Sequence, residues 1–431
     1  MSLQRALAPS EAAMAATGSP TVAGWTLHGD LDTGLLRDAV QVLAHRMPVL
    51  SARIAEGSDG LVLRRDTTDE PVGLGFASDG WASHDAHFLR PGDRVLRVLL
   101  RRDGPREHTL ALLAWHAVSD GACMLALHQR LWRIYRELAA GGGTTPPAES
   151  AGLPRPLEEH LLTRHSPADV TAYAAHWSAR LDASQPAVLF PRAARDGGPG
   201  PVDGAHRHRF TLSAQQTEAL TRAAHRHGTS ANNLLCAMTV TAVRGLLSPK
   251  DGLEQLTCLV PVDLRSRLRP PLPADEFAFA ASTASATVTV GPETGLGTTA
   301  AEIGRQLRTA LDAGHAELEY LATAHMLSRL ASAAVTAAVS NVAPYCAPPV
   351  LPAGLTATRP HVLTIPPGPV PTLFVTRHDE ALCLDLVQPR AWYTREQAGH
   401  LANALLRTLT VTIGAPGMED LDLTRPAPPA R

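Results

Sequence analysis

The stretch WHAVSDG, residues 115–121, lies between two patterns of different period. The apolar run at 109–115 predicts a strand, and apolar residues at helical spacing predict a helix over about 122–139. His116 therefore falls at the end of an element, where a cleft can reach its imidazole. A neutral imidazole can take a proton from a hydroxyl or amine and return it to a leaving thiolate. On spacing alone, a core histidine beside a helix-capping Asp120 is the more common explanation.

Helical and strand patterns alternate irregularly along the rest of the chain, which predicts α/β or α+β layers. A helix ended by Pro48 and then a strand are expected within 31–54. The other expected helices are 122–139, 167–183, 214–227, one from 229 or 230 to 247, 298–313, a stretch 315–336 that can be broken, and 395–412. The other expected strands are 95–100, 109–115, 207–212, 256–262, 284–290, 337–342, 372–376 and 382–387.

The composition limits the classes of function. Apolar residues make up 45% and charged residues 19%, which excludes a wholly disordered chain. The 39 Lys and Arg and 41 Asp and Glu residues give a net charge of −2, without the basic excess of a general nucleic-acid binder. The five cysteines form no CxxC motif, and neither a signal peptide nor a membrane-spanning apolar run is recognisable. We therefore expect a cytoplasmic protein with no nucleic-acid partner and no membrane span.

The length of 431 residues indicates two or three domains, or two halves around one cleft. Two segments, 140–158 and 193–205, are rich in glycine and proline. Such composition is typical of loops and linkers. The region 140–205 is therefore the candidate hinge between two halves.

The pattern His116-x-x-x-Asp120-Gly121 resembles the HHxxxDG signature of condensation domains and their relatives. These relatives include chloramphenicol acetyltransferase, plant HxxxD acyltransferases and the mycobacterial polyketide-associated acyltransferases that make dimycocerosyl esters. Further stretches resemble the same superfamily in the same order, so the resemblance covers nearly the whole chain. They are LLRDAVQVLAHRMPVLSARI (35–54), the paired helices of 212–243, LVPVDLRSRL (259–268) and Ser340-Asn341-Val342.

The resemblance implies two chloramphenicol-acetyltransferase-like αβ halves that form a V with a central tunnel. Residues 1–165 would form the N-terminal half and carry the signature. Residues 166–205 would form a connecting helix and hinge loop, and residues 206–431 the C-terminal half. One substrate would enter the tunnel from each face.

The resemblance also implies roles for individual residues. His116 matches the second signature histidine, which acts as general base on the acceptor. Asp120 matches an aspartate that turns away from the substrate and pairs with an arginine of the second half. Arg265 of the PVDLR stretch is its expected partner, with Arg267 and Arg269 as the competing candidates.

Other site residues are expected from chemistry and from the resemblance together. Gly121 would permit close packing of its helix and leave the channel floor open. The tetrahedral intermediate needs hydrogen-bond donors for its oxyanion. Ser340 and Asn341 are candidates for that role or for substrate contact, with Ser119 as a weaker one, although a strand-entry turn explains Ser340-Asn341 equally well.

Two departures from the family pattern matter. Trp115 stands where the first signature histidine is usual, a position that supports the loop, and its indole predicts an altered pocket wall. This weakens the similarity to peptide-forming condensation domains. The DFGWG motif is absent, and TLFVTRHDEALCLDLV (372–387) occupies part of its region. Loss of activity therefore remains an open interpretation.

We expect an acyltransferase that moves an acyl group from a CoA or acyl-carrier-protein thioester to a hydroxyl of a secondary metabolite or lipid, with an amine less favoured. The mechanism requires no metal, no cofactor and no covalent acyl-enzyme, and the protein is expected to be a monomer. Two alternatives stay open. One is a free-standing amide-forming condensation enzyme, and the other is a non-catalytic carrier-protein-binding module of the same fold.

Overall fold

The computed structural model describes residues 4–65, 72–76, 88–142, 152–183, 204–246, 252–330, 335–366 and 368–414. Its strands are β1 Gln4–Ala6, β2 Pro20–His28, β3 Arg53–Gly57, β4 Gly60–Arg64, β5 Leu74–Phe76, β6 Leu96–Gly104, β7 Glu107–Trp115, β8 Ala205–Leu212, β9 Glu254–Asp263, β10 Ala281–Val290, β11 Val335–Asn341, β12 Thr356–Leu363, β13 Thr372–His378 and β14 Ala381–Pro389. Its helices are α1 Pro9–Ala16, α2 Thr33–Arg46, α3 Gly121–Ala139, α4 Leu157–Leu161, α5 Pro167–Ala183, α6 Ala214–Arg226, α7 Ala231–Arg244, α8 Leu296–Asp312, α9 His315–Leu321, α10 Thr323–Leu330 and α11 Arg395–Ile413. They confirm the predicted mixture of helices and strands.

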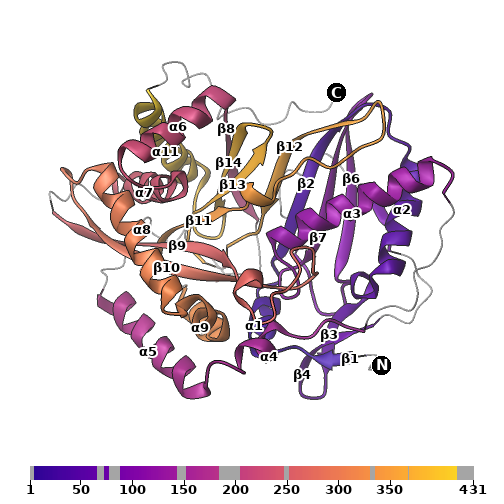
Figure 1. The fold of residues 1–431 in the computed structure, drawn as a ribbon, viewed down its shortest axis with the longest axis horizontal. Helices are drawn as coiled ribbons and strands as arrows, with labels where there is room; N and C mark the ends of the chain where they lie inside the picture. Colours follow the sequence, from indigo (N-terminus) through magenta and orange to yellow (C-terminus); the bar gives the residue numbers. More distant parts are fainter. Residues whose placement is uncertain are drawn as a thin grey trace.

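The N-terminal part of the chain builds a five-stranded sheet in the order β12-β2-β7-β6-β5. The long strands β2, β7 and β6 are antiparallel neighbours. Helices α2 and α3 contact each other and the sheet, and their apolar faces join it in one large core (Figure 1). Asp32 and Asp120 cap these helices by accepting hydrogen bonds from backbone N–H groups of the first turn.

Strand β12 comes from the C-terminal part of the sequence but completes the N-terminal sheet. It pairs antiparallel with β2, so that Val362 lies opposite Ala23 (Figure 1). The C-terminal sheet has six strands in the order β10-β9-β11-β13-β14-β8, with β11 parallel to both of its neighbours. Helices α6, α7, α8 and α11 pack with it around a second core. The crossover of β12 therefore ties the two sheets together.

Most of the predicted elements are present within a few residues of their expected bounds. Pro48 ends α2 as expected, and Ser213 and Thr394 cap α6 and α11 through their hydroxyls. The stretch 315–336 begins as two short helices, α9 and α10. Seven of the elements were not predicted from the sequence, namely β1, α1, β2, β4, β5, α4 and β12. Residues 143–151 and 184–203 of the candidate hinge lie outside the described residues, so the proposed division of the chain stays a prediction.

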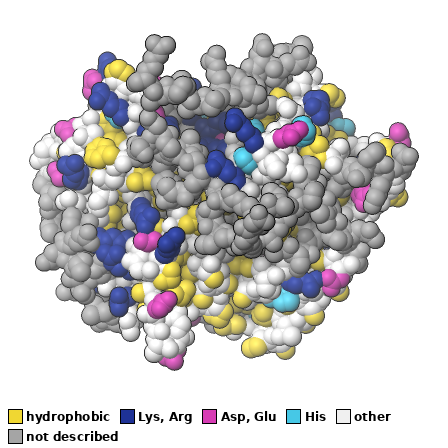
Figure 2. Space-filling model, turned by 180° about the vertical axis from the view of Figure 1, so that it is seen from behind, with side chains coloured by type: hydrophobic (Ala, Val, Ile, Leu, Met, Phe, Trp, Pro, Cys, Tyr) yellow, Lys and Arg dark blue, Asp and Glu magenta, His cyan; other side chains and the backbone are white. Residues whose placement is uncertain are grey.

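Three features of the structure bear on the expectations from composition: the cysteines, the apolar character of the helices and the charges on the surface. All five cysteines are buried and unpaired. Among the described helices, we find none whose length and apolar character would allow it to cross a bilayer. On the face shown in Figure 2, basic side chains lie among acidic and apolar ones instead of covering the whole face.

Candidate functional site

The loop that carries His116 connects the end of β7 to the start of α3. Asp120 is the cap of α3, and its Oδ1 accepts a hydrogen bond of 3.0 Å from the backbone N–H of Cys123. Its backbone is extended, which suits a cap that ends a loop and begins a helix. The strand, the loop and the helix together place His116 and Asp120 at one end of the N-terminal sheet.

The second carboxylate oxygen of Asp120 accepts a hydrogen bond of 2.8 Å from Nη1 of Arg265. It also accepts one of 2.9 Å from the backbone N–H of Ala280. Both charged side chains are 3% exposed. Burial alone would lower the pKa of Arg265, but the Asp120 carboxylate outweighs it and raises that pKa, so the guanidinium stays charged. This buried pair joins two segments that are far apart in the sequence.

The pairing of Asp120 with Arg265 confirms the expected partner. Arg267 instead donates to the backbone carbonyl of Leu311, and Arg269 to that of Leu268. The guanidinium of Arg265 also donates to the backbone carbonyls of Glu276 and Ala278. It therefore fixes the segment that precedes β10 as well as the signature loop.

The ring of His116 is held in one orientation. Its Nδ1 lies 2.9 Å from the backbone carbonyl oxygen of Ser119. A carbonyl oxygen can only accept, so Nδ1 carries the proton and Nε2 keeps its lone pair. The edge of the ring also packs against Phe279, with ring centroids 5.2 Å apart.

The electrostatic surroundings favour a neutral imidazole. Burial lowers the pKa of His116 below its ordinary value, and this outweighs the raising effects of the Ser119 carbonyl and the Asp120 charge. Nε2 has no hydrogen-bond partner among the residues that the structure describes. The arrangement therefore offers an unprotonated nitrogen that can accept a proton near neutral pH.

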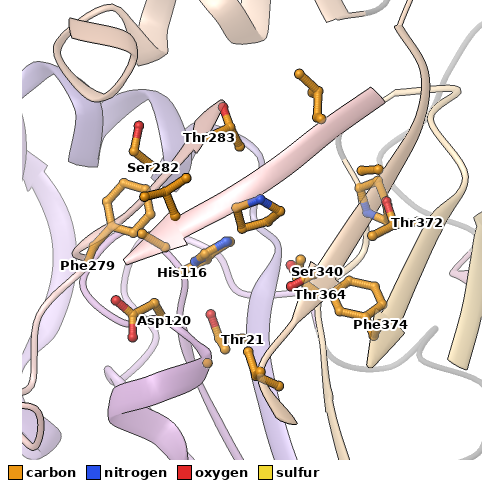
Figure 3. A pocket seen from close by; sticks show the side chains of 18 of the residues that line it. Thr21, His116, Asp120, Phe279, Ser282, Thr283, Ser340, Thr364, Thr372 and Phe374 are labelled. Carbon is orange, nitrogen blue, oxygen red and sulfur yellow. The ribbon is translucent and has the colours of Figure 1, made fainter. Parts of the chain in front are cut away.

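His116 and Asp120 line a cavity of about 380 Å³ between the two large sheets. Strands β2 and β12 contribute residues from one sheet, and β9, β10, β11 and β13 from the other. Figure 3 shows the imidazole of His116 among Phe279, Ser340 and Thr364. The lining is mainly apolar with a few polar groups, which is typical of small-molecule sites.

Trp115 and Ser119 do not line this cavity. Trp115 is fully buried in the core of the N-terminal sheet, so the predicted contribution of its indole to the pocket wall is wrong. The hydroxyl of the fully buried Ser119 donates to the backbone carbonyl of Trp115 at 2.8 Å. Ser119 therefore holds the loop through its hydroxyl and orients His116 through its carbonyl, and its side chain is not placed to contact a substrate.

Gly121, Ser340 and Asn341 all reach the cavity. A Cβ on Gly121 would lie 2.9 Å from Val362 of β12 and 3.0 Å from Val342, which follows β11, so the helix start fits tightly against both strands. The side chain of Asn341 is engaged with Asn232 and with the backbone N–H of residue 343. The hydroxyl of Ser340 has no hydrogen-bond partner within the described part of the chain. Of these two oxyanion candidates, Ser340 is therefore the one whose hydroxyl is available.

The cavity wall also contains an acidic residue that was not predicted from the sequence, Glu319 of α9. It accepts hydrogen bonds from the hydroxyls of Tyr173, at 2.7 Å, and Thr283. Glu317 lies two residues earlier on the same helix, is also buried and does not line the cavity. The sequence contains no signal that distinguishes the two glutamates, because only the packing of α9 decides which one faces the cavity.

Comparison with protein families gives two overlapping matches. The condensation-domain model matches residues 4–248. The model of the phthiocerol/phthiodiolone dimycocerosyl transferase C-terminus matches residues 201–381. The two matches overlap at residues 201–248, where the C-terminal sheet begins with β8.

Curated relatives and solved structures agree with these models. Phthiocerol/phthiodiolone dimycocerosyl transferase of Mycobacterium tuberculosis is 27% identical over 301 residues, which are 67% of this chain and 68% of that protein. Nonribosomal peptide synthetase kk1B of Curvularia clavata is 29% identical over 178 residues, which are 40% of this chain but 1% of that protein. This chain therefore spans only a small part of the synthetase.

The fold is similar to that of polyketide synthase associated protein 5 from Mycobacterium tuberculosis, with a TM-score of 0.76 and 22% identity over 95% of this chain and 98% of that one. It is also similar to trichothecene 15-O-acetyltransferase TRI3 from Fusarium sporotrichioides, with a TM-score of 0.72 and 12% identity over 95% of each chain. These similarities show a shared architecture. Since the condensation-domain model covers more than half of the sequence, the chain belongs to the condensation-domain family of acyltransferases.

Proposed function

We propose that the protein transfers an acyl group from a CoA or carrier-protein thioester to a hydroxyl group of a small secondary metabolite or lipid. The observation that carries this proposal is the orientation of His116. Its Nδ1 is held by the Ser119 carbonyl, which leaves Nε2 as an unprotonated base in a cavity lined by both sheets. Such a base is typically worth 10²–10⁴-fold in rate, as an order of magnitude.

The reaction follows from this geometry. Nε2 of His116 takes the proton of the acceptor hydroxyl as its oxygen attacks the thioester carbonyl. The tetrahedral intermediate then expels the thiolate, which receives the proton from Nε2, so that an ester and a free thiol are formed. The hydroxyl of Ser340 is available to donate to the oxyanion. Asp120 and Arg265 act as positioning residues, because their pair holds the loop without facing a substrate proton.

Several observations support the choice of reactants. The names of two similar proteins describe acyl transfer: one is a dimycocerosyl transferase, and TRI3 is an O-acetyltransferase. The thioester itself supplies the activation, so the proposal needs neither a metal nor a resident cofactor. Cytoplasmic thioester pools would provide the donor, and five unpaired cysteines suit a reducing compartment. The monomeric state stays a prediction.

The test is thiol release from a panel of acyl-CoAs and acyl-pantetheines with alcohol and amine acceptors. Acceptor-dependent release should fall at least about a hundredfold in His116→Ala. His225→Ala is the control, because this histidine is exposed on α6 and should leave release unchanged. Equal release by the wild type and His116→Ala would remove His116 from the mechanism. Release with amines alone would favour the amide-forming alternative, and carrier-protein binding without any release would favour the non-catalytic module.

A further inference from the structure

The described residues that line the cavity include more carboxyl groups than positively charged groups. Three carboxyl groups line it, those of Asp120, Asp263 and Glu319. Among the described lining residues, Arg265 is the one lysine or arginine. Its Nη1 lies 2.8 Å from the carboxylate of Asp120 and 3.2 Å from that of Asp263. His116 contributes no positive charge, because burial lowers its pKa. Glu319 is therefore the lining carboxyl group without a cation of its own.

Glu319 is 2% exposed and is held by two neutral donors. Tyr173 of α5 donates to Oε2 at 2.7 Å, and Thr283 of β10 donates to Oε1. No lysine, arginine or histidine of the described chain lies within ion-pair distance of it. A carboxylate can accept about four hydrogen bonds, so two acceptor positions are left. A buried carboxylate with spare acceptors and no cation within ion-pair distance is a good partner for a cation that arrives with a ligand.

The surrounding charges favour an intermediate protonation state. Burial raises the pKa of Glu319 to about 7, against the lowering effects of the hydrogen bonds from Thr283 and Tyr173 and of the Arg180 charge on α5. His315, at the start of α9, lies against the ring of Tyr173, and burial lowers its pKa. The charge on Glu319 therefore depends on what binds beside it near neutral pH.

We propose that Glu319 binds a protonated amino group of the acceptor, so that the acceptor is an amino alcohol whose hydroxyl is acylated. This inference rests on the proposed function. A protonated amine has no lone pair and cannot attack a thioester, which leaves the hydroxyl as the nucleophile. In Figure 3, Thr283, which binds Glu319, lies on the opposite side of His116 from Thr21. An acceptor that reaches past His116 can place its hydroxyl at Nε2 and its ammonium group at Glu319.

A purely structural role for Glu319 makes a different prediction. Its hydrogen bond to Tyr173 connects α9 to α5, and such a connection requires no ligand. At pH 7 the carboxyl group is about half protonated, because its pKa lies close to that pH. An ammonium group bound beside it would lower the pKa and release about half a proton per ligand. A structural connection alone would release none.

The experiment is calorimetric titration of the whole protein at about pH 7, in two buffers of different ionisation enthalpy. The probes are an aminohexanol with its two groups at opposite ends and the hexanediol of the same length. No acyl donor is present, so the result does not depend on whether acyl transfer occurs. The wild type should bind the aminohexanol at least about tenfold more tightly than the diol, with about half a proton released.

The variant Glu319→Gln should reduce this preference to about twofold or less and abolish the proton release. Glu317→Gln is the matched control, since Glu317 is buried on the same helix but does not line the cavity. It should keep both the preference and the proton release. Equal binding of the two probes by the wild type, or a preference that survives Glu319→Gln, would overturn the proposal. If Glu319→Gln does not fold, the preference of the wild type decides, and equal binding of the aminohexanol and the diol would overturn the proposal.

Discussion

Asp120 and Glu319 are buried carboxyl groups that line the same cavity, but their surroundings differ. Asp120 accepts hydrogen bonds from a guanidinium group and from two backbone N–H groups. Glu319 accepts from two neutral hydroxyls, and burial raises its pKa. The protein therefore supplies the counter-charge of one carboxylate and leaves that of the other to a ligand.

The difference indicates that the two carboxyl groups have different roles in the cavity. A fully paired carboxylate has little capacity left for a substrate, but its strong bonds can fix the loop that orients His116. An unpaired carboxylate fixes little, but its charge can select a ligand. Substitutions around Asp120 should therefore change the stability and the geometry of the loop. Substitutions at Glu319 should change the dependence on pH and on the charge of the ligand.

The largest effect is expected for Arg265→Met, which leaves the buried charge of Asp120 without its cation. Loss of one partner of a buried pair typically costs about 3–5 kcal/mol. Urea unfolding should show this loss, and acceptor-dependent thiol release should fall because the loop of His116 is no longer held. Arg267→Met is the control, since Arg267 is half-buried and donates only to a backbone carbonyl. Its effect on the free energy of unfolding should stay below about 1 kcal/mol.

A smaller loss in Arg265→Met than in Arg267→Met would contradict this side of the comparison. It would mean that the backbone N–H groups of Cys123 and Ala280 are enough to hold Asp120.

The next effect concerns the pH dependence of stability at Glu319. Its pKa rises from an ordinary value of 4.5 to about 7 in the folded protein. Between these values the folded state binds a proton that the unfolded state has released, so this group lowers the free energy of unfolding as pH rises. Glutamine does not titrate. The stability of Glu319→Gln relative to the wild type should therefore increase by roughly 2–3 kcal/mol between about pH 5 and pH 8.

Denaturant unfolding of both proteins across this pH range measures the difference directly. Glu158→Gln serves as a comparison, because burial raises the pKa of Glu158 as well but this residue does not line the cavity. A constant difference between Glu319→Gln and the wild type at all pH values would show that Glu319 is ionised throughout. The comparison with Asp120 would then no longer hold.

The sequence predicted the Asp120 side of the cavity better than the Glu319 side, for a physical reason. His116, Asp120 and Arg265 belong to short motifs with defined spacing, and the Asp120–Arg265 pair is present as expected. Glu319 belongs to the helix HAELEYL, in which Glu317 and Glu319 are both flanked by apolar or aromatic residues. Which glutamate faces the cavity depends on how α9 packs against β10 and α5, and this packing joins segments far apart in the chain.

The missed elements have a similar explanation. Strand β2 is buried on both faces, so it lacks the alternation of apolar and polar residues that indicates a half-buried strand. Strand β12 contains Pro360 next to Arg359, which has a positive φ, and its pairing with β2 shifts register there. Proline inside a run argues against a strand. Only the tertiary contact with β2 completes the sheet.

The smallest effect is expected for Gly121→Ala, beside Asp120. The new Cβ would lie 2.9 Å from Val362 and 3.0 Å from Val342. Overpacking of this kind costs about 1–3 kcal/mol, whereas alanine gains up to about 1 kcal/mol over glycine in a helix. The net loss of stability should therefore be about 1 kcal/mol, measured by urea unfolding. The double variant Gly121→Ala/Val362→Ala should suffer less from the second substitution than Val362→Ala does alone, because the Cβ fills part of the space. If the two effects are simply additive, the helix start does not press against β12, and the tight packing assigned to the Asp120 side of the cavity is wrong.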